Sequence, residues 1–171
     1  MTDNTTRIQE IHAEIARLKA ELLMLNPYAG LNELSNKEFG EQWSESYIVE
    51  HCPNFVREDK KGYDLYSEKL GRVEVKSTRV PNKGITFNQV HPYDCDYLLL
   101  AIYDTHNGGE TLYLVPIKAI FDKEIKVNNQ HGRTVLGEIP ECGTISDTKS
   151  NMAVLNSKYR IESWEGLNGK A

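Results

Sequence analysis

Two acidic residues and a lysine within residues 60–80 have types and spacing that could do chemistry together. Ten positions separate Asp64 from Glu74, and Lys76 follows Glu74 by two positions. Alternating apolar and polar residues predict two strands here, with a turn at residues 68–71. A hairpin folded at that turn brings the two carboxylates together beside the ammonium group of the lysine.

Carboxylates that lie close together repel each other unless a cation lies between them. A small set of hard oxygen ligands suits Mg²⁺, which keeps several waters and bridges to phosphate. Water on such an ion becomes a nucleophile near neutral pH, and Lys76 can orient or deprotonate it. The three residues therefore predict a site for phosphodiester hydrolysis. Taken singly, each also has a structural explanation: a strand-edge acid for Asp64, and a solvated charge pair for Glu74 and Lys76.

The neighbouring segments predict the elements that would position these residues. "SNKEFGEQWSESYIVEHC" reads as a helix that Ser35 or Asn36 can cap, and its apolar residues form one stripe. "DYLLLAIYD" reads as a strand, "DTHNGGETLYLVP" as a hairpin turning at residues 107–109, and "IKAIFDKE" as a short helix. The last third is polar, with one or two short strands. This order of two helices, several antiparallel strands, a short helix and an irregular tail predicts a mixed α/β or α+β fold around a central sheet.

The N-terminal segment "RIQEIHAEIARLKAELLML" predicts a helix over residues 7–25, ended by Asn26-Pro27. Its apolar residues follow the heptad a and d spacing: Ile8, Ile11, Ile15, Leu18, Leu22 and Leu25. Two interpretations stay open, a dimer seam and a helix docked on its own domain. We expect residues 1–30 to form this helix, and residues 31–171 to form a single domain with a loop-rich C-terminal part.

Composition limits the function classes. A chain of 171 residues suits one domain, and its net charge of −5 argues against bulk electrostatic binding of nucleic acid, although local patches and bound cations decide that question. The sequence has no run of about 18 apolar residues, so we expect no membrane-spanning helix. The polar N-terminal residues do not resemble a secretory signal. The cysteines Cys52, Cys95 and Cys142 have no zinc spacing and fit a reduced, cytoplasmic setting.

The order Asp64…Glu74-Val75-Lys76 resembles the PD-(D/E)XK motif of the restriction-endonuclease-like nuclease superfamily, with Tyr63 in place of the motif's proline. The surroundings are similar too, over roughly residues 36–118. The upstream helix resembles the one that carries an acid near the metal in that superfamily, and "ITFNQVHPYDCDYLLLAIYD" resembles its downstream strand. For the helix acid the best match is Glu45, followed by Glu41.

The resemblance implies a restriction-endonuclease-like core, with a central mixed sheet flanked by helices. It also implies a cytoplasmic, Mg²⁺-dependent DNA endonuclease for which Mn²⁺ substitutes, most similar to type II restriction endonucleases that cut double-stranded DNA as homodimers. The implied catalytic residues are Asp64, Glu74, Lys76 and Glu45. The implied metal ligands are Asp64, Glu74 and Val75.

Further residues are predicted to contact DNA. The main set comprises Lys61, Ser77, Thr78, Arg79, Lys83, Asn88 and Gln89. Lys60 and Arg133 are further phosphate candidates. Loops of the C-terminal third offer possible groove readers: Lys149, Asn151, Asn156, Lys158 and Arg160. We interpret His91, His106 and His131 as surface residues, since none has a partner at ligand spacing.

Two other functions remain open. One is a structure-specific repair nuclease similar to archaeal Holliday-junction resolvases, although these are strongly basic and this chain is acidic. The other is a non-catalytic interaction module with a degenerate nuclease fold, against which the intact Asp64, Glu74 and Lys76 count.

Overall fold

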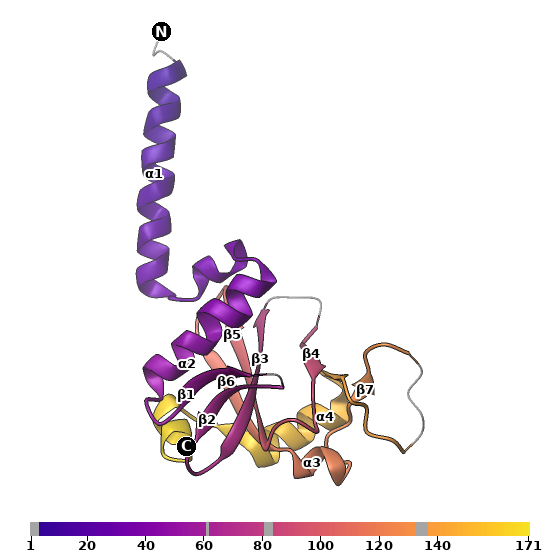
Figure 1. Cartoon of the computed structure of the whole chain (residues 1–171). Coiled ribbons are helices and arrows are strands. Elements are labelled where there is room, and N and C mark those ends of the chain that lie inside the picture. The colour runs from indigo at the N-terminus through magenta and orange to yellow at the C-terminus, as the bar shows by residue number, and fades with distance from the viewer. Residues whose placement is uncertain (1–3, 61, 81–83, 133–136) are drawn as a thin grey trace.

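A six-stranded mixed sheet forms the centre of the protein (Figure 1). The structure is a computed structural model that describes residues 4–60, 62–80, 84–132 and 137–171. The strand order is β1-β2-β3-β5-β6-β9. The strands are β1 (Val56–Lys60), β2 (Tyr63–Ser67), β3 (Gly71–Val80), β5 (Tyr97–Asp104), β6 (Glu110–Pro116) and β9 (Arg160–Ile161). The α+β class and the mixed central sheet with flanking helices are thereby confirmed.

The β2–β3 hairpin has the predicted turn. Its antiparallel register pairs Ser67 with Gly71 and Leu65 with Val73. Gly71 has φ of +78°, and a Cβ atom added there would meet the Asp96 carboxylate at 2.6 Å. Both the conformation and the close approach therefore require glycine at this turn.

One strand pair differs from the antiparallel prediction. Strands β3 and β5 are parallel, with Glu74 opposite Leu98 and Lys76 opposite Leu100. Parallel neighbours need a crossover connection, which here is the chain between β3 and β5. This crossover contains β4 (Thr86–Val90), which leaves the central sheet and joins a second sheet of order β4-β8-β7.

The sheet is buried on both faces. Alternate residues of β5 face two separate cores, with Leu99, Ala101 and Tyr103 in one and Leu98, Leu100 and Ile102 in the other. The first core includes Ile48 of α2 (Glu45–His51) and Leu167 of α5 (Trp164–Asn168). The second includes Ile120 of α3 (Lys118–Phe121) and Phe87 of β4. The protein is therefore three-layered around the sheet.

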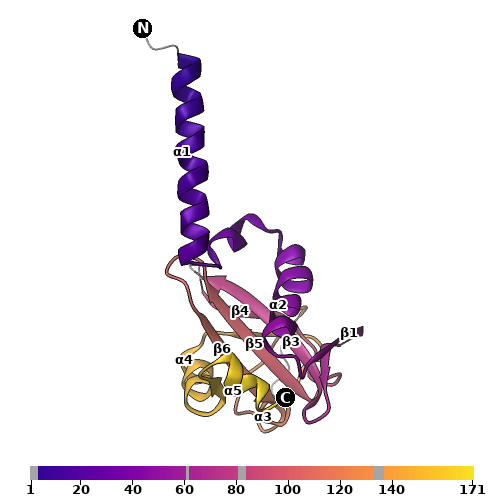
Figure 2. The ribbon, with the colours of Figure 1, turned by 90° about the vertical axis from the view of Figure 1, so that its left-hand side faces the viewer.

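The N-terminal helix α1 (Asn4–Leu25) projects away from the body in both views (Figures 1 and 2). None of its residues is buried, so the interpretation of a helix docked on its own domain is wrong. Its base is fastened to the body. Asn26 is buried, donates through its amide to the Thr105 carbonyl and accepts the N–H of Tyr28. The 3-10 helix η1 (Ala29–Glu33) follows.

The second helix is confirmed but is not uniformly α-helical. A π-helical segment, η2 (Glu38–Ser44), precedes α2. The capping prediction holds, because Ser35 and Glu38 exchange hydrogen bonds between side chain and main-chain N–H. The wider π turns rotate the helix face that follows, so Ser44 and Glu45 are buried together with Phe39.

The C-terminal third is more regular than predicted. It contains β7 (Asn128–Asn129), β8 (Gly143–Ser146), α4 (Lys149–Val154) and the π-helix η3 (Leu155–Tyr159), besides β9 and α5. One buried amide explains how so polar a segment folds. Asn151 accepts the N–H of Lys126 and donates to the carbonyls of Lys126 and Ser146. Within the described residues, no helix is long and apolar enough to cross a bilayer.

Candidate active site

A cavity of about 640 Å³ lies against η2, α2, β3 and β4. Four residues predicted for catalysis or metal binding line it, namely Glu45, Asp64, Val75 and Lys76. So do five predicted DNA contacts: Ser77, Thr78, Arg79, Asn88 and Gln89. Lys61, Lys83 and Arg133 lie outside the described residues. Residues that are far apart in the chain thus meet at one concave surface.

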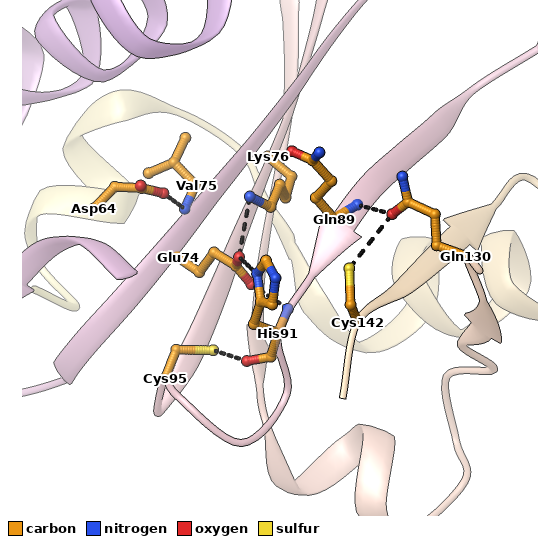
Figure 3. Close-up of polar contacts among 9 residues, drawn as sticks. All are labelled: Asp64, Glu74, Val75, Lys76, Gln89, His91, Cys95, Gln130 and Cys142. Atoms are coloured by element: carbon orange, nitrogen blue, oxygen red, sulfur yellow. Dashed lines mark hydrogen bonds and ion pairs between the residues drawn. The ribbon is translucent and has the colours of Figure 1, made fainter. Parts of the chain in front are cut away.

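Asp64 lies where the β2–β3 pairing ends. Its carboxylate accepts the N–H of Val75 at 2.7 Å (Figure 3). Asp64 is one residue beyond Leu65, and Val75 two residues beyond Val73, in the last pair of the strand register. The N–H and C=O of one strand residue leave by the same edge of the strand. The carbonyl of Val75 therefore faces the same edge as Asp64. Asp64 and Val75 both line the cavity, so a carboxylate and a main-chain oxygen, both hard ligands, are available at its wall.

Glu74 occupies a different environment. It is 1% exposed, and its Oε1 lies 3.0 Å from both Lys76 Nζ and His91 Nδ1. Its Oε2 accepts the N–H of His91 at 2.9 Å. In Figure 3 the β3 ribbon passes between the carboxylates of Glu74 and Asp64. Glu74 pairs with Lys76 as predicted, but it lies beneath the lysine and does not line the cavity with Asp64. The predicted convergence of the two carboxylates on one site is therefore not formed.

Glu45, at the first position of α2, is 5% exposed and forms an ion pair with Arg57 of β1 at 3.0 Å. A buried carboxylate is stable only when it is paired. Arg57 also donates to the hydroxyl of Ser46 and the carbonyl of Glu41, so the guanidinium joins β1 to the η2–α2 helix. Sequence reasoning missed Arg57 because nothing in the spacing links β1 to this helix.

Arg79 lines the cavity but has a structural task. Its guanidinium donates to the carbonyls of Leu31 and Leu34 and to the Asn36 side chain, and it lies 4.6 Å from the ring centre of Phe39. These contacts hold the segment between α1 and η2 against β3. The charge predicted to meet phosphate is thus already engaged by carbonyl oxygens.

Amide side chains form the wall of the cavity at β4. Gln89 has φ of +55°, uncommon outside glycine, at a register shift between Phe87 and Val90. Its N–H donates to Gln130 Oε1 at 2.7 Å. Asn88 accepts the hydroxyl of Thr144. Gln130, which the sequence analysis did not single out, completes this wall because β7 and β8 bring it beside β4.

The interpretation of His91 as a surface residue is wrong. Its side chain is only 34% exposed, and both its ring and its main-chain N–H contact Glu74. Its carbonyl accepts the thiol of Cys95, and burial, together with the nearby Glu74 charge, raises the pKa of that thiol to about 12. Cys95 is therefore a neutral packing residue beneath the site. His106 and His131 are exposed, as predicted.

The proposed readers in the C-terminal third lie elsewhere. All five are described, and none of them lines the cavity. Asn151 is 1% exposed and holds the main chain, so its prediction as a reader is wrong. Asn156 accepts the hydroxyl of Tyr113, and Lys158 pairs with Glu124 at 2.8 Å. Three of the five, Asn151, Asn156 and Lys158, therefore make contacts within the fold.

The oxygen donors at the cavity are few. Among the described residues, no group of three or more His, Cys, Asp or Glu side chains is arranged to hold a metal ion. Three carboxylates line the cavity: Glu41 is 63% exposed and pairs with Lys37, whereas Glu45 and Asp64 lie with Val75 as the predicted ligands. Such a set fits Mg²⁺, which takes one or two carboxylates and keeps several waters. Glu74 would join it only after leaving Lys76 and His91.

Comparison with models of known protein families finds no match, and no curated protein matches the sequence.

Proposed function

We propose that the protein is a divalent-metal-dependent DNA endonuclease with a restriction-endonuclease-like core, of the type II kind that cuts double-stranded DNA at a specific sequence. One observation carries the proposal. Glu45, Asp64, Val75 and Lys76 come from a helix and two strands, yet they line one cavity. This is the combination of hard oxygen donors and a positioned ammonium group that phosphodiester hydrolysis needs.

Each residue has a role in this proposal. A bound Mg²⁺ supplies a water of lowered pKa and stabilises the charge on phosphorus. Asp64, the Val75 carbonyl and Glu45 are the groups that would hold the cation. The Lys76 ammonium orients the attacking water and balances negative charge on the phosphate, and Glu74 keeps the ammonium in place through the 3.0 Å ion pair.

The charge of the cavity lining also supports a substrate whose binding depends on a cation. The lining contains three basic side chains, Lys37, Lys76 and Arg79, and three acidic ones, Glu41, Glu45 and Asp64. A balanced cavity in a chain of net charge −5 attracts a phosphate backbone weakly until a cation is bound. The amide wall at β4, with Asn88, Gln89 and Gln130, offers donors and acceptors that suit base edges.

The test is digestion of a mixed-sequence plasmid with Mg²⁺, Mn²⁺ or EDTA, followed by sequencing of the ends. Metal-dependent cleavage with a shared end sequence is the expected result. Lys76→Met should abolish it, whereas Lys69→Met, an exposed lysine on the β2–β3 turn, should not. Metal-dependent cutting of four-way junctions but not plasmid would assign the same site to a structure-specific nuclease.

A second candidate is a non-catalytic interaction module on the same fold. One observation favours it: the Glu74 carboxylate is fully engaged by Lys76 and His91, as in a structural ion pair. Absence of cleavage with every divalent metal and nucleic acid tried, by a folded protein, would select this function over the nuclease.

A further inference from the structure

Helix α1 carries an uncovered apolar stripe. Its six residues at heptad a and d positions are between 45% and 78% exposed: Ile8, Ile11, Ile15, Leu18, Leu22 and Leu25. A continuous apolar stripe of this kind is what a coiled-coil partner covers. With about 1.5 Å of rise per residue, α1 is about 33 Å long and offers three heptads to a partner.

The residues beside the stripe select the partner and its direction. Glu14 occupies a g position and Lys19 the following e position. In a parallel pair of identical helices, each g residue faces the next e residue of the other helix, so Glu14 meets Lys19 twice. In an antiparallel pair with Ile15 opposite Leu18, g positions face each other. Glu14 then meets Glu21, again twice, and like charges are brought together.

One of the three heptads has the core combination of a two-stranded assembly. The central heptad has Ile15 at a and Leu18 at d, the combination that favours two parallel strands. The ion pair between Lys19 and Glu33 of the same chain does not oppose it, because both side chains are at least 66% exposed and their charged atoms are 3.5 Å apart. Lys19 is therefore available to a second helix.

We propose that α1 forms a parallel two-stranded coiled coil with α1 of a second copy of this chain. The seam consists of the six stripe residues, and its direction is set by Glu14 and Lys19. Both bodies then follow α1 at the same end of the seam, so the two cavities also lie at that end. The proposal rests on α1 alone, and it holds or fails independently of any nuclease activity.

Charge exchange on the full chain tests the direction-setting pair. In sedimentation equilibrium at low salt, Glu14→Lys should weaken the dimer roughly tenfold, because two attractive contacts become repulsive. Adding Lys19→Glu should restore the affinity. Glu10→Lys is the matched control. It also removes an ion pair within the helix, Arg7 with Glu10 at 2.9 Å, at a position outside the seam, whereas Glu14→Lys removes the two-bond contact of Arg17 with Glu14. Equal weakening by Glu10→Lys would overturn the assignment.

Disulfide formation tests the direction itself. In a Cys142→Ser background, where the remaining native cysteines Cys52 and Cys95 are buried, Ile8→Cys and Leu25→Cys are prepared as separate proteins. In a parallel dimer each variant should cross-link with itself. Cross-linking only when the two variants are mixed would show an antiparallel seam. A wild-type chain that is monomeric at 100 μM, or that sediments as a trimer or tetramer, would also overturn the proposal.

Discussion

Glu74 accepts the main-chain N–H of His91, and its Oε1 lies 3.0 Å from the His91 ring Nδ1. His91 directly follows β4, so this contact fastens the crossover to β3 in the middle of the central sheet. Since the same carboxylate holds Lys76, the position of the ammonium group depends on a residue that lies 15 positions later in the chain.

Loss of the His91 ring should destabilise the fold. His91→Ala removes one of the hydrogen-bonding partners of a carboxylate that is 1% exposed, and it should lower the free energy of unfolding by about 1–3 kcal/mol. Urea denaturation followed by circular dichroism measures this. His106→Ala is the control, since that ring is exposed and its loss should change stability by less than about 0.5 kcal/mol. Equal effects of the two variants would contradict the role given to His91.

Asp64→Asn should separate chemistry from folding. The amide oxygen can still accept the Val75 N–H, so the hairpin should keep its stability. Metal-dependent cleavage should fall roughly a thousandfold, which corresponds to about 4 kcal/mol of barrier. DNA affinity in EDTA or Ca²⁺ should hold or improve, because one negative charge is lost.

Single-turnover cleavage and gel shifts measure these two quantities for Asp64→Asn. Asp122→Asn, an exposed acid after α3, is the control and should match the wild type. A folded Asp64→Asn protein that cuts at the wild-type rate would exclude this site as the catalytic centre.

Glycine should be favoured over other residues at position 89. Its φ of +55° costs a residue with a side chain about 1–2 kcal/mol, a cost that glycine does not have. Gln89→Gly and Gln89→Ala both remove the amide side chain and leave the main-chain N–H to Gln130. The glycine variant should therefore be more stable than the alanine variant by about 1 kcal/mol, measured by thermal unfolding. The opposite order would show that the backbone of Gln89 is not strained.

Asp96 should link stability to pH. Hydrogen bonds from Arg72 hold the pKa of Asp96 below its ordinary value. A lowered pKa means that this carboxylate stabilises the fold above its unfolded pKa of about 3.9, and that the contribution disappears as pH falls through the folded pKa. The stability difference between wild type and Asp96→Asn should thus be largest above about pH 5 and shrink towards pH 2. Denaturation curves across that range measure it. A difference that grows on acidification would contradict the ion pair.

Local patterns explain which parts of the site were predictable. The β2–β3 hairpin depends on alternation and a short turn, so the hairpin and the pairing of Glu74 with Lys76 could be predicted. The convergence of Asp64 with Glu74 could not, because Glu74 is taken up by Lys76 and His91 beneath the cavity. Glu45 was found because it lies on a recognisable helix, although the π-helical segment that buries it leaves no periodic signal. The fold class followed from the order of elements.

Contacts between distant segments explain the remainder. The parallel pairing of β3 with β5 and the departure of β4 into a second sheet are decided by which faces can be buried together, and no short window of sequence encodes this. For this reason His91, Arg57 and Gln130 could not be assigned from spacing. The same applies to Asn151, whose polarity suggested a surface role but whose amide replaces main-chain hydrogen bonds inside the fold.

The contacts at the base of α1 determine how the helix is connected to the sheet. Asn26 joins the end of the helix to the loop between β5 and β6, the Tyr28 hydroxyl donates to Glu110 at 2.6 Å, and Arg79 fixes the chain that follows. The chain that follows α1 is thus held at three points, one of them on β3. A load on the helix would reach the sheet through these residues, at the strand that also lines the cavity.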